Sequence, residues 1–288
     1  MQPTRIVRVV VSSVLAASGA FWTGGAFAQP PGQPLQEGQH FTIDPVSDGL
    51  LIVSGAGLSS LLTLVLSTGE IAPSPPGDAS KLLSIDRGAV TQSIDKNAGP
   101  YSDIGLYTAV GFAVLDPLLS GFRDGWDAAL VDAVMYAESV SLTETLTDIT
   151  KIAVRRPRPV DYLNCAGQPT SATGCGSTDL QLSFFSGHSA TVASIGATAT
   201  YLAFERSPHT ARPRITLGVG TALTTFVSYE RVRSGNHFPT DVLAGAMTGV
   251  AVGVLVPHLH RHKEEAPPVW IGAEPAPGGG SITLGGLF

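Results

Sequence analysis

Charged side chains are scarce in this chain of 288 residues, at 14% of the sequence, and aromatic side chains are scarcer still, at 7%. The formal net charge of −6 gives no general attraction to nucleic acid, so DNA and RNA are not expected partners. Small and aliphatic residues dominate instead, as suits closely packed helices. The length allows one large domain or two small ones, with ample chain for a sizeable core.

Cysteine is nearly absent, and both copies, Cys165 and Cys175, lie close together in the second half of the chain. Two cysteines at this spacing in an exported protein most simply form one disulfide. The alternative, a pair of metal ligands, lacks a further cysteine or histidine nearby.

The first 28 residues have the pattern of an export signal. Arg5 and Arg8 form a positive segment, residues 9–20 are apolar, and Ala26-Phe27-Ala28 is a small-x-small cleavage site. The short apolar run, broken by Ser and Gly, favours cleavage over retention as an uncleaved anchor. We therefore expect an exported protein in the periplasm of a Gram-negative-type bacterium.

Apolar and amphipathic segments predict an all-α bundle over residues 49–262. Residues 29–48 form a Pro/Gln/Gly-rich lead-in, and the Pro/Gly-rich tail, 263–288, can end in a short strand or β-hairpin. The pattern places helices at 49–66, 104–119, 126–150, 189–204, 215–229 and 239–255.

Two of these segments, 49–66 and 242–256, approach the roughly 20 residues needed to span a bilayer. The 126–150 helix carries five carboxylates, so it cannot face lipid along its length. This favours a soluble or peripherally attached bundle. The alternative is an integral membrane protein with a periplasmic active site.

Three polar clusters interrupt the apolar pattern in a fixed order. They supply three cations, two histidines and one carboxylate, which is what is needed to hold a phosphate and transfer it through a histidine. The clusters are Lys151-x6-Arg158-Pro159, Ser186-Gly187-His188 and Arg231-x5-His237-x3-Asp241.

Local chemistry gives several of these residues a role. Gly187 and Ser186 precede a helix start, whose free N–H groups form an anion site to which the Ser186 hydroxyl can add. Pro239 is typical of a first helical position, so Asp241 falls in the first turn of the helix. From there its carboxylate can reach back to a ring nitrogen of His237 and fix the tautomer.

The three clusters together resemble the signature of the type 2 phosphatidic acid phosphatase family, relatives of class A bacterial acid phosphatases and vanadium haloperoxidases. The resemblance covers the middle and C-terminal half. It implies a metal-free, cofactor-free phosphatase acting on a phosphate ester, above all a lipid at a membrane surface. His237 would attack phosphorus, Asp241 orient it and His188 protonate the leaving group; Lys151, Arg158, Ser186, Gly187 and Arg231 would bind phosphate. His237 must then be neutral and His188 charged.

The chain departs from the family pattern at two positions. Phe185 replaces a proline before Ser-Gly-His, and Glu230 replaces a serine before Arg231, where a carboxylate would repel phosphate unless it pairs with Arg231 or faces away. Two alternatives stay open: a haloperoxidase, because vanadate fits the same cradle as prosthetic group or inhibitor, and a catalytically weakened envelope protein that binds phosphorylated lipid.

Two further features lie outside the signature. Glu138 lies on the apolar stripe of the 126–150 helix, where it could pair with a site arginine or be a solvated edge residue. His258, His260 and His262 alternate near the end of the last helix. Such a run can bind a divalent metal, but it more often ends a helix near its negative pole, so no metal site is predicted.

Overall fold

The computed structural model describes residues 41–68, 75–169, 171–261, 270–276 and 279–285. Seven α-helices lie in this part of the chain, and the signal segment 1–28 lies outside it. The elements are α1 (Pro45–Ser67), η1 (Ala79–Lys81), η2 (Arg87–Val90), α2 (Ala98–Asp124), α3 (Trp126–Val154), α4 (Pro159–Cys165), η3 (Thr178–Gln181), α5 (Gly187–Arg206), α6 (Arg212–Arg233), α7 (Pro239–His260), β1 (Trp270–Ala276) and β2 (Gly279–Gly285).

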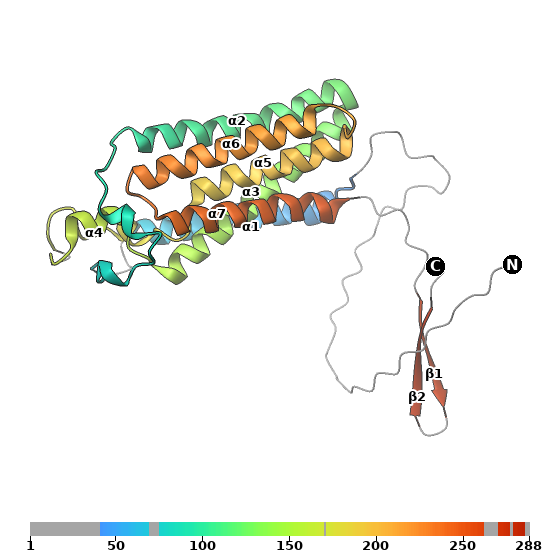
Figure 1. Ribbon diagram of the computed structural model, residues 1–288. Helices are drawn as coiled ribbons and strands as arrows, with labels where there is room; N and C mark the ends of the chain where they lie inside the picture. Colours follow the sequence, from blue (N-terminus) through green and yellow to red (C-terminus); the bar gives the residue numbers. More distant parts are fainter. Residues whose placement is uncertain (1–40, 69–74, 170, 262–269, 277–278, 286–288) are drawn as a thin grey trace. The chain divides into compact units, whose positions relative to one another are not determined.

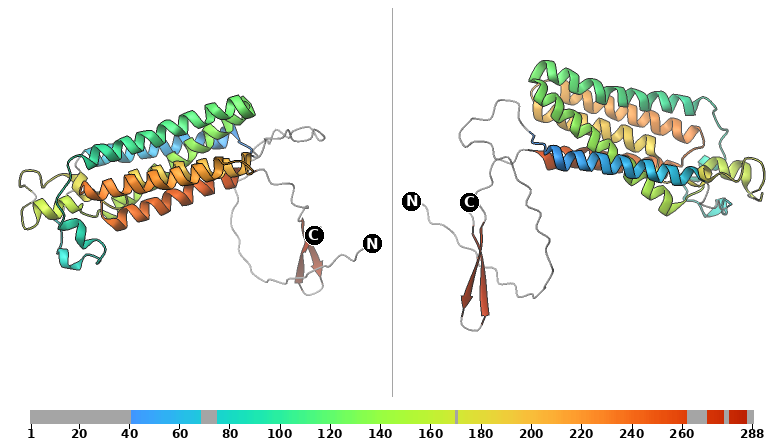
Figure 2. Two further views of the ribbon diagram at one scale, coloured as in Figure 1. Left: turned by 45° about the horizontal axis from the view of Figure 1, so that its top comes forward. Right: turned by 180° about the vertical axis from the view of Figure 1, so that it is seen from behind.

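The α-helices form one bundle around α5, which contacts α2, α3, α6 and α7. The long helices lie side by side, and the segment that holds α4 extends beyond one end of the bundle (Figures 1 and 2). The centre of the bundle holds fully buried apolar side chains from three helices, among them Met135, Leu202 and Val227. The predicted all-α bundle is confirmed.

The strands β1 and β2 belong to a separate unit of the chain and pair antiparallel, with Trp270 opposite Gly285 and Ala276 opposite Gly279. The short C-terminal hairpin predicted from the tail is therefore present. The predicted disulfide is also present, between Cys165 at the end of α4 and Cys175 in the following loop.

The predicted helices all occur, but several are longer. The first begins at Pro45 instead of Gly49, because Asp44 caps it by accepting the N–H groups of Val46 and Ser47. The lead-in is therefore shorter than predicted. The second runs from Ala98 through Pro117 to Asp124 and so extends beyond both ends of the predicted 104–119.

Four of the five carboxylates of α3 are buried or half-buried in the bundle, and the fifth, Asp127, is exposed in the first turn of the helix, which weakens the objection to a membrane. Asp132 pairs with Arg206 at 2.6 Å, and Asp148 accepts the Ser59 hydroxyl at 2.5 Å. Glu144 accepts the hydroxyl of Thr191. Acidic groups satisfied inside the bundle leave the outer face of this helix free for apolar residues.

The outer surface of the bundle is rich in large apolar side chains. Val53 on α1, Tyr107 on α2 and Met247 on α7 are 65–70% exposed. These three helices are also long and apolar enough to cross a membrane. Such faces fit lipid better than water, so the chain is membrane-associated. Both the predicted peripheral attachment and the alternative of an integral membrane protein allow this.

Close packing of α5 on α7 depends on glycines spaced four residues apart on α7. A Cβ atom at Gly245, Gly249 or Gly253 would approach a backbone oxygen of the segment 186–194 to within 2.0–2.5 Å. Small residues at this spacing let two helix backbones approach one another.

We expect Gly249→Ala to destabilise the protein by about 1–3 kcal/mol, because the new methyl group would overlap the carbonyl oxygen of Ala190. Thermal unfolding in detergent, followed by circular dichroism, measures the effect. The matched control is Gly218→Ala, where no atom lies within 4 Å and the helix gains from alanine. Equal melting temperatures for the two variants would contradict close α5–α7 contact.

Candidate active site

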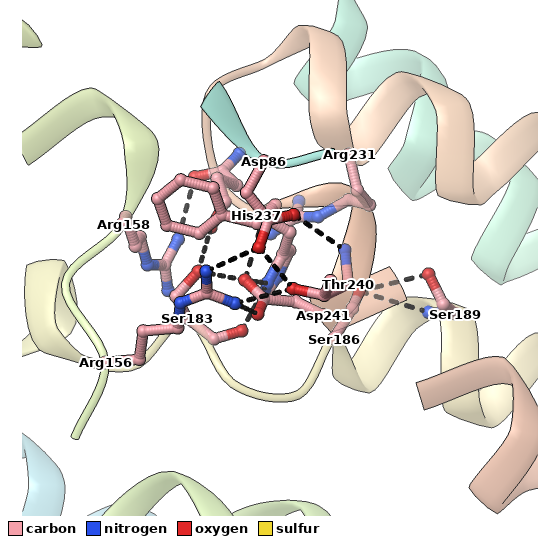
Figure 3. Close-up of polar contacts among 12 residues, drawn as sticks. Asp86, Arg156, Arg158, Ser183, Ser186, Ser189, Arg231, His237, Thr240 and Asp241 are labelled. Carbon is pink, nitrogen blue, oxygen red and sulfur yellow. Dashed lines mark hydrogen bonds and ion pairs between the residues drawn. The ribbon is translucent and has the colours of Figure 1, made fainter. Parts of the chain in front are cut away.

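The three polar clusters meet at one end of the bundle. They come from the end of α3 and the loop to α4, from the start of α5, and from the end of α6 with the loop to α7. Figure 3 shows Arg158, Arg231 and Asp241 around His237. The sequence placed these residues on separate helices, and the fold brings them together.

His237 lies in the loop before α7 and is 2% exposed. Its Nδ1 lies 2.6 Å from the carbonyl oxygen of Ser183. A carbonyl oxygen can only accept, so Nδ1 carries the proton and Nε2 keeps its lone pair. Burial lowers the pKa of His237 well below its usual value, and the charges of Arg158, Arg231 and Lys151 lower it further. The imidazole is neutral, as a nucleophile must be.

Asp241 does not bond His237 directly, which corrects the sequence prediction. Its Oδ2 lies 3.9 Å from His237 Nδ1, too far for a hydrogen bond. The same oxygen accepts the N–H of Phe238 at 2.8 Å and also the hydroxyl of Ser183. Ser183 therefore connects the two residues, because its hydroxyl donates to Asp241 while its carbonyl accepts from His237.

Arg156 anchors Asp241 from the other side. Its guanidinium donates to the Asp241 carboxylate, to Thr240 Oγ1 at 2.8 Å and to Asp86 Oδ2 at 2.8 Å. It also stacks on the Phe238 ring at 4.0 Å. Neither Arg156 nor Ser183 nor Asp86 belongs to the three motif clusters, so the sequence analysis missed all three residues.

Arg158 is buried and held in a fixed orientation. Its Nε and Nη2 donate to the backbone oxygen and carboxylate of Asp179, at 2.8 and 2.6 Å, and Nη1 donates to Asn236 Oδ1 at 2.7 Å. Asn236 precedes His237 in the chain, so this bond keeps the guanidinium beside the histidine loop. The predicted phosphate-binding position of Arg158 agrees with this placement.

Arg231 and His188 meet at an acidic residue that the sequence analysis missed. His188 Nε2 lies 2.8 Å from Asp103 Oδ1 on α2, and Arg231 Nη1 lies 3.9 Å from the same oxygen. In the described part of the chain, Arg231 Nε has no hydrogen-bond partner although it is buried. The only signal for Asp103 was a carboxylate at the edge of an apolar segment.

The protonation predicted for His188 does not hold in the ligand-free protein. Burial and the charges of Arg231 and Lys151 lower its pKa to about 4, although Asp103 acts in the opposite direction. His188 is therefore neutral near pH 7 until a negative group arrives. A phosphate dianion beside it would raise its pKa.

The Ser186-Gly187 pair builds the start of α5. Ser186 Oγ accepts the N–H of Ser189 at 3.4 Å as an N-cap. Accepting this bond does not use the O–H of Ser186, so its donation to an anion stays a prediction. A Cβ at Gly187 would lie 3.2 Å from Thr147 and 3.7 Å from Lys151 Nζ. Glycine thus lets the positive end of α5 approach the Lys151 ammonium.

The two glutamates of interest do not join the cluster. Glu230 is buried, and its nearest cation is Arg233 at 3.8 Å, not Arg231. Glu138 lies near His260 and Asp48, so the predicted pairing with a site arginine is wrong.

A known protein family and a solved structure are similar to this chain. The sequence profile of the PAP2 superfamily matches residues 132–265, which contain all three clusters. No curated protein matches it. Among solved structures it is similar to a transmembrane PAP2 type phosphatidylglycerolphosphate phosphatase from Bacillus subtilis, with 21% identity, 75% of this chain and 94% of that chain covered, and a TM-score of 0.45.

We expect Arg156→Lys to lower kcat by roughly 10²-fold with little change in KM, because lysine cannot bridge Asp86, Thr240 and Asp241 at once and a small displacement of His237 is costly. Steady-state kinetics with an aryl phosphate measure this split. The control is Arg155→Lys, since Arg155 is exposed one residue away. Equal kcat values for the two variants would argue against a positioning role.

Proposed function

We propose that this chain is a membrane-associated phosphatase that hydrolyses phosphomonoesters, above all lipid phosphates, through a phosphohistidine and without a metal. The observation that carries the proposal is the neutral His237, whose Nδ1–H donates to the Ser183 carbonyl and whose pKa is lowered by burial and by the charges of Arg158, Arg231 and Lys151. The match of residues 132–265 to the PAP2 superfamily supports the same class of activity.

The reaction has two displacements at phosphorus. In the first, the Nε2 lone pair of His237 forms a P–N bond while the P–O bond to the leaving group breaks, and His188 gives its proton to the departing oxygen. In the second, water attacks phosphorus, His188 takes a proton from that water, and the P–N bond breaks to release phosphate. The cations stabilise the equatorial oxygens in both steps.

The lipid and periplasmic parts of the proposal rest on other observations. The site lies at one end of a bundle with three helices able to cross a membrane, so a headgroup at the bilayer surface could reach it. The Cys165–Cys175 disulfide fits an oxidising compartment, as does the export signal of the sequence. Vanadate, which shares the shape of phosphate, is expected to inhibit.

Glu230 does not argue for a weakened enzyme, because its carboxylate lies nearer to Arg233 than to any other cation. Among the charges that shift the pKa of Arg231 are those of Asp103 and Asp179, and Glu230 is not one of them. We therefore infer a competent enzyme.

His237→Ala is expected to reduce hydrolysis of p-nitrophenyl phosphate, with EDTA present, by on the order of 10³-fold or more, because the nucleophile is lost. Rapid quenching with labelled substrate should trap an acid-labile, alkali-stable phosphoenzyme that the variant lacks. His209→Ala, an exposed histidine in the loop between α5 and α6, is the matched control. Ordinary turnover in His237→Ala would refute the nucleophile.

The pH dependence should identify His188 as the acid. With a ligand-free pKa near 4, the fraction of His188 that carries the proton falls as pH rises above that value. Hence kcat/KM for an alkyl phosphate should decline with rising pH. His188→Ala should remove this decline and cost about 10²–10⁴-fold with alkyl phosphates, but much less with activated aryl phosphates. Equal losses on both substrates, with an unchanged pH profile, would contradict the assignment.

A further inference from the structure

A second polar cluster lies far from the candidate active site. It consists of Asp48 on α1, Glu138 on α3 and His260 on α7, with one ligand atom of each within 4.8 Å of the others. Because α7 starts at the active site and His260 is its last residue, about 30 Å of helix separates the two places. The proposed phosphatase mechanism uses none of these three residues.

The two distances from His260 to the carboxylates are close to those between ligands of one ion. His260 Nε2 lies 3.4 Å from Asp48 Oδ1 and 3.4 Å from Glu138 Oε2. A charge-assisted hydrogen bond between nitrogen and carboxylate is shorter, about 2.7–2.9 Å. Two ligand atoms about 2.05 Å from a tetrahedral Zn²⁺ stand about 3.3 Å apart.

The tautomer of His260 also favours a metal. Its Nδ1 lies 2.9 Å from the carbonyl oxygen of Val256, to which it donates, so the lone pair of a neutral ring is on Nε2 and faces both carboxylates. This is the arrangement in which a backbone carbonyl orients a metal-binding imidazole. Without a cation, a lone pair facing two anions is repulsive.

Charge balance points the same way. Two carboxylates with a protonated imidazole leave the buried cluster at −1, whereas two carboxylates, a neutral imidazole and a divalent ion sum to zero. Among the described residues, Glu138 Oε1 has no hydrogen-bond partner, and the glutamate is only 5% exposed. An uncompensated buried carboxylate is costly, so a ligand for this oxygen would stabilise the fold.

Neighbouring groups hold the Asp48 carboxylate in place, and a groove beside Glu138 and His260 gives a metal ion access to the cluster. Asp48 is held by the N–H of Asp44 at 2.7 Å and by the Ser47 hydroxyl at 3.2 Å. Glu138 and His260 also line a groove of about 330 Å³, which could admit an ion and leave room for a water ligand.

We propose that Asp48, Glu138 and His260 bind one divalent transition-metal ion, of which Zn²⁺ is the probe, and that this ion ties α1 to α3 and α7. An imidazole with two carboxylates suits zinc, whereas Ca²⁺ and Mg²⁺ prefer oxygen ligands alone. The proposal is independent of the phosphatase chemistry.

The test is Zn²⁺ binding by the full-length protein in detergent, stripped with EDTA and dialysed. Competition with a chromophoric chelator should give one site, and Co²⁺ in place of Zn²⁺ should show the visible absorption of a tetrahedral ion. Glu138→Gln and His260→Ala should each weaken Zn²⁺ binding by at least about 100-fold, since even outer-shell partners are worth 10–100-fold.

The matched control is His258→Ala, because His258 lies two residues away and bonds the Tyr201 hydroxyl at 3.0 Å instead of joining the cluster. It should bind Zn²⁺ as the parent does. Retained hydrolysis of p-nitrophenyl phosphate, or an unchanged circular dichroism spectrum, shows that each variant is folded. Absence of Zn²⁺ binding by the folded parent would overturn the proposal, as would equal affinity in the His260→Ala and His258→Ala variants.

Discussion

The geometry of the candidate active site depends on the ion pair between Arg156 and Asp241. Asp241 stands in the first turn of α7, and Arg156 lies in the loop that follows α3, so the pair joins two segments distant in the sequence. Through the Ser183 hydroxyl the same carboxylate reaches the loop before α5. Three segments thus converge on one buried charge, and each supplies residues of the candidate active site.

This arrangement assigns Asp241 a different task from the one its spacing suggested. The carboxylate is too far from His237 to bond it, and it acts by fixing Ser183, whose carbonyl then selects the tautomer. The Ser183 carbonyl is a neutral acceptor. It therefore orients the His237 ring without placing a full negative charge beside it. The low pKa of His237 agrees with that choice, since burial and nearby cations dominate its surroundings.

Much of the bundle could be predicted, because apolar periodicity and helix-start residues are local signals. The disulfide between Cys165 and Cys175 and the three motif clusters could be predicted equally well. Arg156, Ser183 and Asp103 were not, because each gains its role from a partner more than 50 residues away. The argument against a membrane-spanning bundle was weak for a related reason: the carboxylates of α3 were counted as exposed, and their partners on other helices could not be predicted from one segment.

The two buried arginines of the site, Arg158 and Arg231, each lie near a carboxylate that offsets their charge. Arg158 pairs with Asp179 and Arg231 lies near Asp103, and these two acids are 67% and 45% exposed, whereas the arginines are nearly buried. Exposed carboxylates keep much of their hydration and hold a partner weakly. A phosphate dianion can therefore displace them without leaving an unpaired charge inside the protein. Asp179 and Asp103 keep the arginines oriented in the absence of substrate. Because both acids are exposed, water can solvate them when an anionic substrate takes their place.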